Sequence, residues 1–237
     1  MKKSLLIIFL ILIIDQALKF WIKLNMTIGQ EFHIFDNWFI IHFTENEGMA
    51  FGLSFGGEFG KLALSLFRIV AIVAIAWYLS DLIKKKANTG IVVSISLILA
   101  GAVGNMLDSA FYGLMFSFSS YHSVAQLFPE AGGYGTFLHG KVVDMLYFPL
   151  IEGHYPEWVP IWGGNDFIFF RPVFNIADSS ITVGVFLLII FQRKFFAKPA
   201  VKEESNDGEE TTTIEEPGKE NFSVKEAVNL KDENMQD

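Results

Sequence analysis

Residues 4–24 read SLLIIFLILIIDQALKFWIKL, an apolar stretch of 21 residues whose charged side chains all lie in its second half. At 1.5 Å per residue, a helix of this length is about 30 Å long, which matches the hydrocarbon core of a bilayer. Two lysines precede the stretch, as in a secretory signal, but no small-residue cleavage site follows it. Asp15 and Lys19 would also serve no purpose in a disposable signal. We therefore expect a retained membrane-spanning helix.

The rest of the chain also has the composition of a membrane protein, with 51% hydrophobic residues among 237. Three further apolar runs, at residues 61–83, 89–107 and 173–191, are each about long enough to cross a bilayer. Basic clusters precede the first run, separate the second from the third, and follow the fourth. Because such clusters remain on the cytoplasmic side, we expect four transmembrane helices with both termini in the cytoplasm.

The two remaining connections, residues 25–60 and 108–172, are then extracytoplasmic. Residues 38–44 combine aromatic and β-branched side chains, which favours a strand. The predicted fold class is an all-α membrane protein with four transmembrane helices and a small extracytoplasmic β element. Residues 1–197 are expected to form this membrane domain, and residues 198–237 a disordered cytoplasmic tail that is too polar to offset its ordering entropy.

Charge and cysteine content exclude several classes of function. The formal net charge is −8, and residues 201–237 account for all of it, with 12 acidic residues against 4 lysines (4 − 12 = −8). The acidity therefore describes the tail, and the chain shows no excess of basic residues for a nucleic-acid partner. The chain has no cysteine, so disulfides, thiol catalysis and cysteine-bound metal are excluded.

Carboxylates are the candidate functional groups. Ionisable side chains at membrane depth are costly, so they are expected to converge on the bundle interior or on a wet cavity. Two adjacent carboxyl groups cannot both ionise cheaply, so one keeps its proton. Such a pair can hydrolyse a peptide without a metal, because the ionised member activates water while the protonated member polarises the carbonyl and serves the leaving amine. The expected topology places four aspartates near the outer membrane surface: Asp15, Asp108, Asp144 and Asp178.

Five motifs in this order resemble those of the lipoprotein signal peptidases, also called signal peptidase II. They are DQALK at 15–19, NEGMAF at 46–51, GAVGNMLD at 101–108, VVDM at 142–145 and FNIAD at 174–178. Each motif alone is weak, but together they cover most of residues 1–193. The resemblance adds a choice that the residues themselves leave open, namely which two of the four aspartates react.

The resemblance implies an aspartyl endopeptidase with Asp144 and Asp178 as its catalytic dyad and with neither metal nor cofactor. Its expected partners are membrane lipids and prolipoproteins that carry diacylglycerol, cleaved on the amino side of the lipidated cysteine. The expected location is the bacterial inner membrane, with the site near the periplasmic face and the protein a monomer. The residues implied to line or shape the site are Asp15, Lys19, Asn46, Gly48, Ala50, Gly101, Gly104, Asn105, Asp108, Asn175 and Ala177.

One position departs from the family pattern. The family has arginine directly after the aspartate of the third motif, whereas this chain has Ser109. Arg171 and Lys141 are the basic residues that we consider as replacements. Arg68, in the second apolar run, is interpreted as a snorkelling or ion-paired structural residue.

Other functions remain open from the residues alone. The histidines of the outer segments lack the spacing of a metal site, and no serine-nucleophile motif is present. An ion-coupled transporter or proton relay would also place aspartates and lysines in the membrane, although no inverted repeat is evident. A non-enzymatic anchor that displays its acidic tail would leave the outer aspartates unexplained.

Overall fold

The computed structural model describes residues 2–36, 38–47, 57–169 and 172–195. The chain divides into two units, Met1–Ala197 and Lys198–Asp237. The whole second unit lies outside the described residues, and with it the predicted disordered tail.

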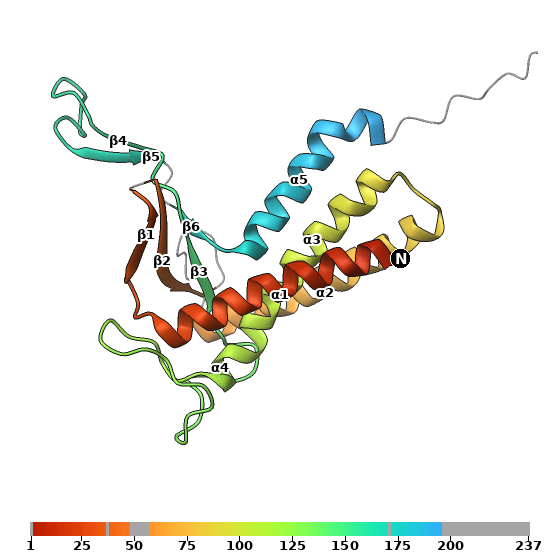
Figure 1. Cartoon of the computed structure of the whole chain (residues 1–237), viewed down its shortest axis with the longest axis horizontal. Coiled ribbons are helices and arrows are strands. Elements are labelled where there is room, and N and C mark those ends of the chain that lie inside the picture. Colours follow the sequence, from red (N-terminus) through yellow and green to blue (C-terminus); the bar gives the residue numbers. More distant parts are fainter. Residues whose placement is uncertain (1, 37, 48–56, 170–171, 196–237) are drawn as a thin grey trace, which may run out of the picture. The chain divides into compact units, whose positions relative to one another are not determined.

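Helices form most of the first unit (Figure 1). They are α1 (Lys2–Asn25), α2 (Gly57–Lys84), α3 (Thr89–Leu107), the π-helical turn η2 (Asp108–Tyr112), α4 (Gly113–Met115) and α5 (Ile176–Phe195). Among the described residues, three helices are long and apolar enough to cross a membrane: Lys2–Asn25, Phe59–Lys84 and Thr89–Met115. These three agree with the first three predicted spans. The third is longer than predicted, because the helical path continues through η2 and α4 into the segment expected to be a loop.

The count of four spans requires a correction. The fourth apolar run was expected to be helical from residue 173, but Val173–Phe174 form strand β6 and α5 begins only at Ile176. The described apolar part of α5, Ile176–Phe191, is consequently shorter than the three candidate spans. Pairing with β3 accounts for this difference, because Phe174 lies opposite Leu146 in an antiparallel ladder.

The predicted β element is present as a four-stranded antiparallel sheet with the order β1-β2-β3-β6. The strands are β1 (Glu31–Phe35), β2 (Phe39–Asn46), β3 (Val142–Tyr147) and β6. The strand expected at residues 38–44 is confirmed as β2, whose Thr44 lies opposite Asp144. A separate hairpin pairs β4 (Ile151–His154) with β5 (Asp166–Phe169), and the sequence had not suggested it.

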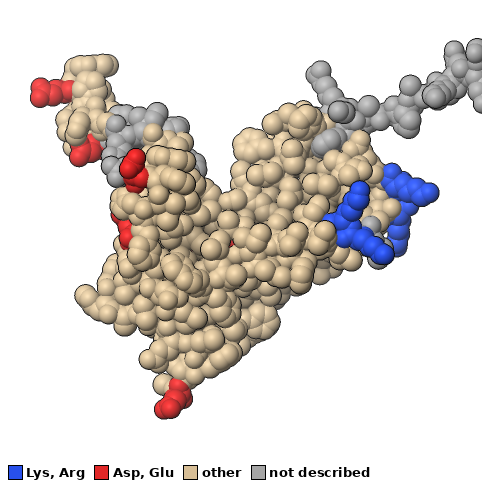
Figure 2. Space-filling model, in the orientation of Figure 1, with Lys and Arg blue, Asp and Glu red and all other residues tan. Residues whose placement is uncertain are grey.

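α3 is the central helix and packs against α1, α2 and α5. Its buried side chains include Ile95 and Leu99, whereas α1 and α2 expose large apolar side chains such as Phe9 and Phe67. Such outward apolar faces suit lipid contact. Figure 2 shows the Lys and Arg side chains of one face gathered at the end of the helices where the N-terminus lies.

Candidate active site

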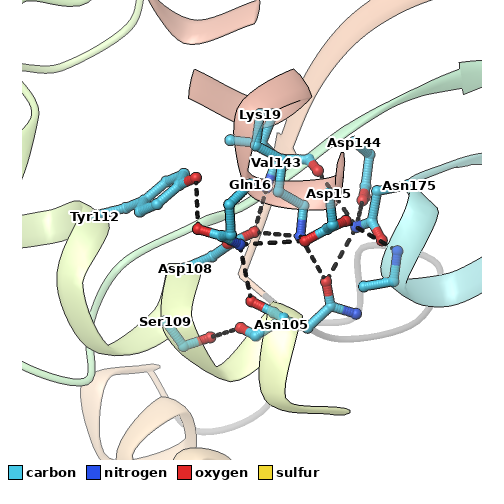
Figure 3. A network of polar contacts seen from close by, with 12 residues as sticks. Asp15, Gln16, Lys19, Asn105, Asp108, Ser109, Tyr112, Val143, Asp144 and Asn175 are labelled. Carbon is cyan, nitrogen blue, oxygen red and sulfur yellow. Dashed lines mark hydrogen bonds and ion pairs between the residues drawn. The ribbon is translucent and has the colours of Figure 1, made fainter. Parts of the chain in front are cut away.

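A buried polar network lies where α1, α3, η2 and α5 meet strand β3 (Figure 3). Asp15, Lys19, Asp108 and Asn175 have no exposed surface, and Asp144 is 3% exposed. The chain brings these groups together from segments more than 150 residues apart, since Ala177 of α5 contacts Asp15 of α1. The four predicted aspartates therefore all belong to one region of the fold.

Lys19 is the cation at the centre of the network. Its Nζ lies 2.9 Å from Asp15 Oδ2 and 2.8 Å from Asp108 Oδ2, and it donates a hydrogen bond of 3.0 Å to Asn105 Oδ1. The sequence suggested a neutral pair of Asp15 and Lys19, but the structure adds a second carboxylate. Because buried charges are stable only when paired and hydrogen-bonded, this cation allows both acids to be buried.

Asp15 and Asp108 each hold a backbone N–H next to another aspartate. Asp15 Oδ1 accepts a hydrogen bond of 2.9 Å from the N–H of Ala177, the residue before Asp178. Asp108 Oδ2 accepts one of 3.3 Å from the N–H of Val143, the residue before Asp144. Lys19 joins the two acids, so the three side chains form a clamp that fixes α5 relative to β3.

Asn175 caps α5 and connects the other two aspartates. Its Oδ1 accepts a hydrogen bond of 2.9 Å from the N–H of Asp178, while Asp178 Oδ2 accepts one of 3.3 Å from the N–H of Asn175. This reciprocal pattern is a capping box, which satisfies two donors at the helix start. The Asn175 amide also donates to Asp144 Oδ1 at 2.7 Å. One asparagine thereby sets the positions of both acids.

Two further amides complete the surroundings of this pair. Asn105 donates to Asp178 Oδ1 at 2.7 Å, and Asn46 donates to Asp144 Oδ2. Burial and the nearby negative charge of Asp178 raise the pKa of Asp144 to about 7, against the opposing effect of the amide donors. Asp144 and Asp178 thus interact as two carboxyl groups that share one environment, which is the electrostatic condition for one to keep a proton.

Three of the predicted site residues lie in the contact between α3 and α5. A Cβ on Gly101 would lie 2.2 Å from the carbonyl oxygen of Ala177, and one on Gly104 would lie 2.9 Å from Asp15 Oδ2. Both positions therefore require glycine for close packing. Ala177 itself has no exposed surface. These small residues act on the site by letting the start of α5 approach α3.

Some side chains of the network were not predicted. Gln16 donates to Asp108 Oδ1 at 2.9 Å and to Asp15 Oδ2 at 3.1 Å, and it accepts a hydrogen bond of 3.1 Å from the Tyr112 hydroxyl. Gln16 lies inside the DQALK motif, so the motif could have indicated it as a site residue. Tyr112 lies outside all five motifs and is brought in only by η2.

A second buried cation supports strand β2 beside Asn46. Lys23 has no exposed surface, forms an ion pair with Glu45 and donates a hydrogen bond of 3.0 Å to Ser119 Oγ. Glu45 precedes Asn46 in β2, so this contact ties the strand to α1 and to the segment that follows α4.

The remaining residues named from the sequence either lie outside the described residues or make contacts away from the two acids. Gly48, Ala50 and Arg171 lie outside the described residues. Lys141 contacts Glu47, with 3.7 Å between Nζ and Oε1, and lies over the ring of Phe118. Within the part of the chain that the structure describes, no group of three or more His, Asp or Glu side chains could hold a metal ion.

The fold and the site together define a membrane protein with several apolar helices, a small antiparallel sheet and a buried cluster of carboxylates, amides and lysine. Residues 7–194 match the signal peptidase (SPase) II family, and the chain belongs to that family of membrane proteases. It is 52% identical over 185 residues to a lipoprotein signal peptidase of Porphyromonas gingivalis, covering 78% of this chain and 80% of the relative.

Two further comparisons agree. A lipoprotein signal peptidase of Amoebophilus asiaticus is 35% identical over 209 residues, covering 87% of this chain and 84% of the relative. A bacterial membrane enzyme solved by the in meso method at 2.3 Å resolution superposes with a TM-score of 0.54 at 27% identity, covering 90% of this chain and 96% of that one. The family resemblance drawn from the five motifs is thereby confirmed.

Proposed function

We propose that this protein is an aspartyl endopeptidase that removes the signal peptide from diacylglyceryl-modified prolipoproteins, with Asp144 and Asp178 as the catalytic dyad. The observation that carries the proposal is that Asn175 joins two carboxyl groups, since its side-chain amide donates to Asp144 and its backbone N–H donates to Asp178, while the pKa of Asp144 is raised to about 7. Family membership supports prolipoproteins as the substrates.

The reaction needs one charged and one protonated carboxyl. The ionised member takes a proton from water as the water oxygen attacks the scissile carbonyl carbon, and the protonated member donates to the carbonyl oxygen. When the C–N bond breaks, the leaving amine receives a proton and the other product is a carboxylic acid. Asn46, Asn105 and Asn175 hold the two acids during these steps through the hydrogen bonds described above.

The proposed orientation places this site at the periplasmic side of the inner membrane, with the basic ends of the helices in the cytoplasm. α5 then starts at the dyad and runs toward the cytoplasmic side, where it ends after Arg193 and Lys194. A diacylglycerol anchor in the outer leaflet would bring the scissile bond to the dyad and supply proximity. Monomeric action is part of the proposal, as is the cytoplasmic position of the acidic tail.

The substrate class can be tested with two forms of one precursor. Purified protein in detergent should shorten a diacylglyceryl-modified prolipoprotein and leave the unmodified precursor intact, because the lipid delivers the bond. Mass spectrometry of the product should find the lipidated cysteine as its N-terminal residue. Equal cleavage of both forms, or cleavage at another bond, would contradict the proposed specificity.

The raised pKa of Asp144 predicts the alkaline side of the pH profile. A carboxyl that keeps its proton to about pH 7 can act as an acid up to that pH, so kcat/KM should fall as pH rises above about 7. The amide of Asn46 favours the ionised form of Asp144, so Asn46→Ala should raise the pKa of Asp144 further and move this fall to higher pH. The measurement is kcat/KM between pH 5 and 9, in steps of about half a unit.

Asn25→Ala is the matched control, because Asn25 is an exposed asparagine that donates only to the Trp21 carbonyl among its described contacts. Its profile should coincide with the wild type. An Asn46→Ala profile with an unmoved alkaline side would show that Asp144 does not supply the proton.

A further inference from the structure

Arg68 is a charged residue on the inward face of α2. Ser65, one turn before it, is 2% exposed and donates a hydrogen bond of 3.1 Å to the Leu138 carbonyl, so this face is turned to the rest of the protein. Phe67 and Val70, on either side, are 69% and 67% exposed. Arg68 is therefore directed away from the surface proposed to face lipid.

A guanidinium at this position is expensive in a membrane. Arg68 lies 16 residues before Lys84, the end of α2, which is about 24 Å along the helix axis and therefore within the outer part of a hydrocarbon core of roughly 30 Å. Charged groups at such depth face the interior and usually mark a functional site. Surface snorkelling does not account for Arg68, because its side chain reaches across to η2.

The contacts of Arg68 lead to the dyad. Its Nη1 donates to Ser109 Oγ at 3.4 Å, a long and weak hydrogen bond that directs the guanidinium without neutralising it. Ser109 directly follows Asp108 and donates to the carbonyl of Asn105, whose side-chain amide donates to Asp178 Oδ1 at 2.7 Å, so Asp108 and Asp178 are the two acids that this chain of contacts reaches. Asp108 already shares Lys19 with Asp15, so of these two acids Asp178 is the one outside that ion-pair cluster.

We propose that Arg68 is a positioning residue of the peptidase site, which holds the negative charge of the dyad on Asp178 and leaves the proton on Asp144. This inference rests on the proposed function and deepens it, because it assigns a different role to each acid. In this arrangement Asp178 activates the water and Asp144 protonates the carbonyl oxygen and the leaving amine.

Ser109 explains how a residue of α2 can take this role. Ser109 is 1% exposed, and its Oγ donates to the Asn105 carbonyl at 3.2 Å while it accepts from Arg68. A small side chain here leaves space for the guanidinium that arrives from α2. The positive charge that the family pattern places directly after the aspartate is thereby supplied from another helix. Neither Arg171 nor Lys141 is needed for this.

The test measures kcat and KM against pH for Arg68→Gln with the diacylglyceryl-modified precursor. Loss of the cation should raise the pH at which the dyad first ionises by roughly one unit and reduce kcat at neutral pH on the order of tenfold, with KM little changed. Arg68→Lys should keep most of the wild-type kcat. Arg68→Gln combined with Ser109→Arg should recover kcat, because it returns a guanidinium to the same point.

Lys85→Gln provides the control. Lys85 directly follows the end of α2, and its exposed positive charge pairs with Asp81 of that helix. Its profile should match the wild type. The inference is overturned if Arg68→Gln keeps the wild-type kcat and profile, or if Lys85→Gln shifts the profile equally. It is also overturned if Arg68→Lys is as slow as Arg68→Gln and the added Ser109→Arg change restores nothing. Failure of the proposed function is a separate result, because it would appear as full activity in Asp144→Asn whatever Arg68 does.

Discussion

Replacing Lys19 by methionine is expected to lower the free energy of unfolding by about 3–5 kcal/mol, because two buried carboxylates lose their cation. Asp15 and Asp108 lie within 2.9 Å of Lys19 Nζ and have no exposed surface. Methionine keeps most of the volume and removes the charge together with the N–H donors, including the one to Asn105. The same change should reduce cleavage, since the clamp that holds α5 against β3 is lost.

The measurement is thermal unfolding of the detergent-solubilised protein, followed by circular dichroism. Lys85→Met is the matched control, because it breaks an exposed i, i+4 pair with Asp81 and should barely alter the melting temperature. Adding Asp15→Asn to Lys19→Met should recover part of the loss by removing one unpaired charge. A Lys19→Met protein that melts with the wild type would contradict the role assigned to the clamp.

The apolar runs predicted four spanning helices, of which three are found among the described residues, and the aromatic and β-branched residues predicted strand β2, because length and side-chain type suffice for these elements. They failed at the start of the fourth run. Val173 and Phe174 are as apolar as the residues that follow, and only their pairing with Tyr147 and Leu146 makes them a strand. A contact between segments that are distant in sequence decided this boundary, and no local pattern reports it.

The residue types of the candidate site could be predicted from the sequence, but the hydrogen bonds and ion pairs between them could not. Membrane topology brought the aspartates to one region, and the cost of burial implied that they would be paired. That Asp15 and Asp108 reach the N–H groups of Ala177 and Val143 depends on helix packing, which the sequence does not display. The contact of Arg68 was missed for the same reason, because its partner Ser109 lies on a π-helical turn that no motif announced.

The largest loss of activity is expected from Asp144→Asn and from Asp178→Asn. Each change keeps the volume of the side chain and removes the carboxyl group that exchanges a proton, so cleavage should fall by roughly two to four orders of magnitude. Each change should cost some stability without unfolding the protein, because the volume is kept while an amide nitrogen replaces one of two oxygens that accept hydrogen bonds. Asp166→Asn is the control, since the side chain of Asp166 on β5 is 74% exposed.

The most direct measurement is the conversion of a diacylglyceryl-modified prolipoprotein to its shorter form, followed by gel shift, with wild type, Asp144→Asn, Asp178→Asn and Asp166→Asn. The account predicts conversion by the wild type and by Asp166→Asn, and none by the two dyad variants, which should remain folded by circular dichroism. Cleavage at the wild-type rate by either folded dyad variant would contradict the assignment of the pair. An inactive wild type would contradict the proposed peptidase activity. It would instead favour a transporter or proton-relay function for the aspartates of the network.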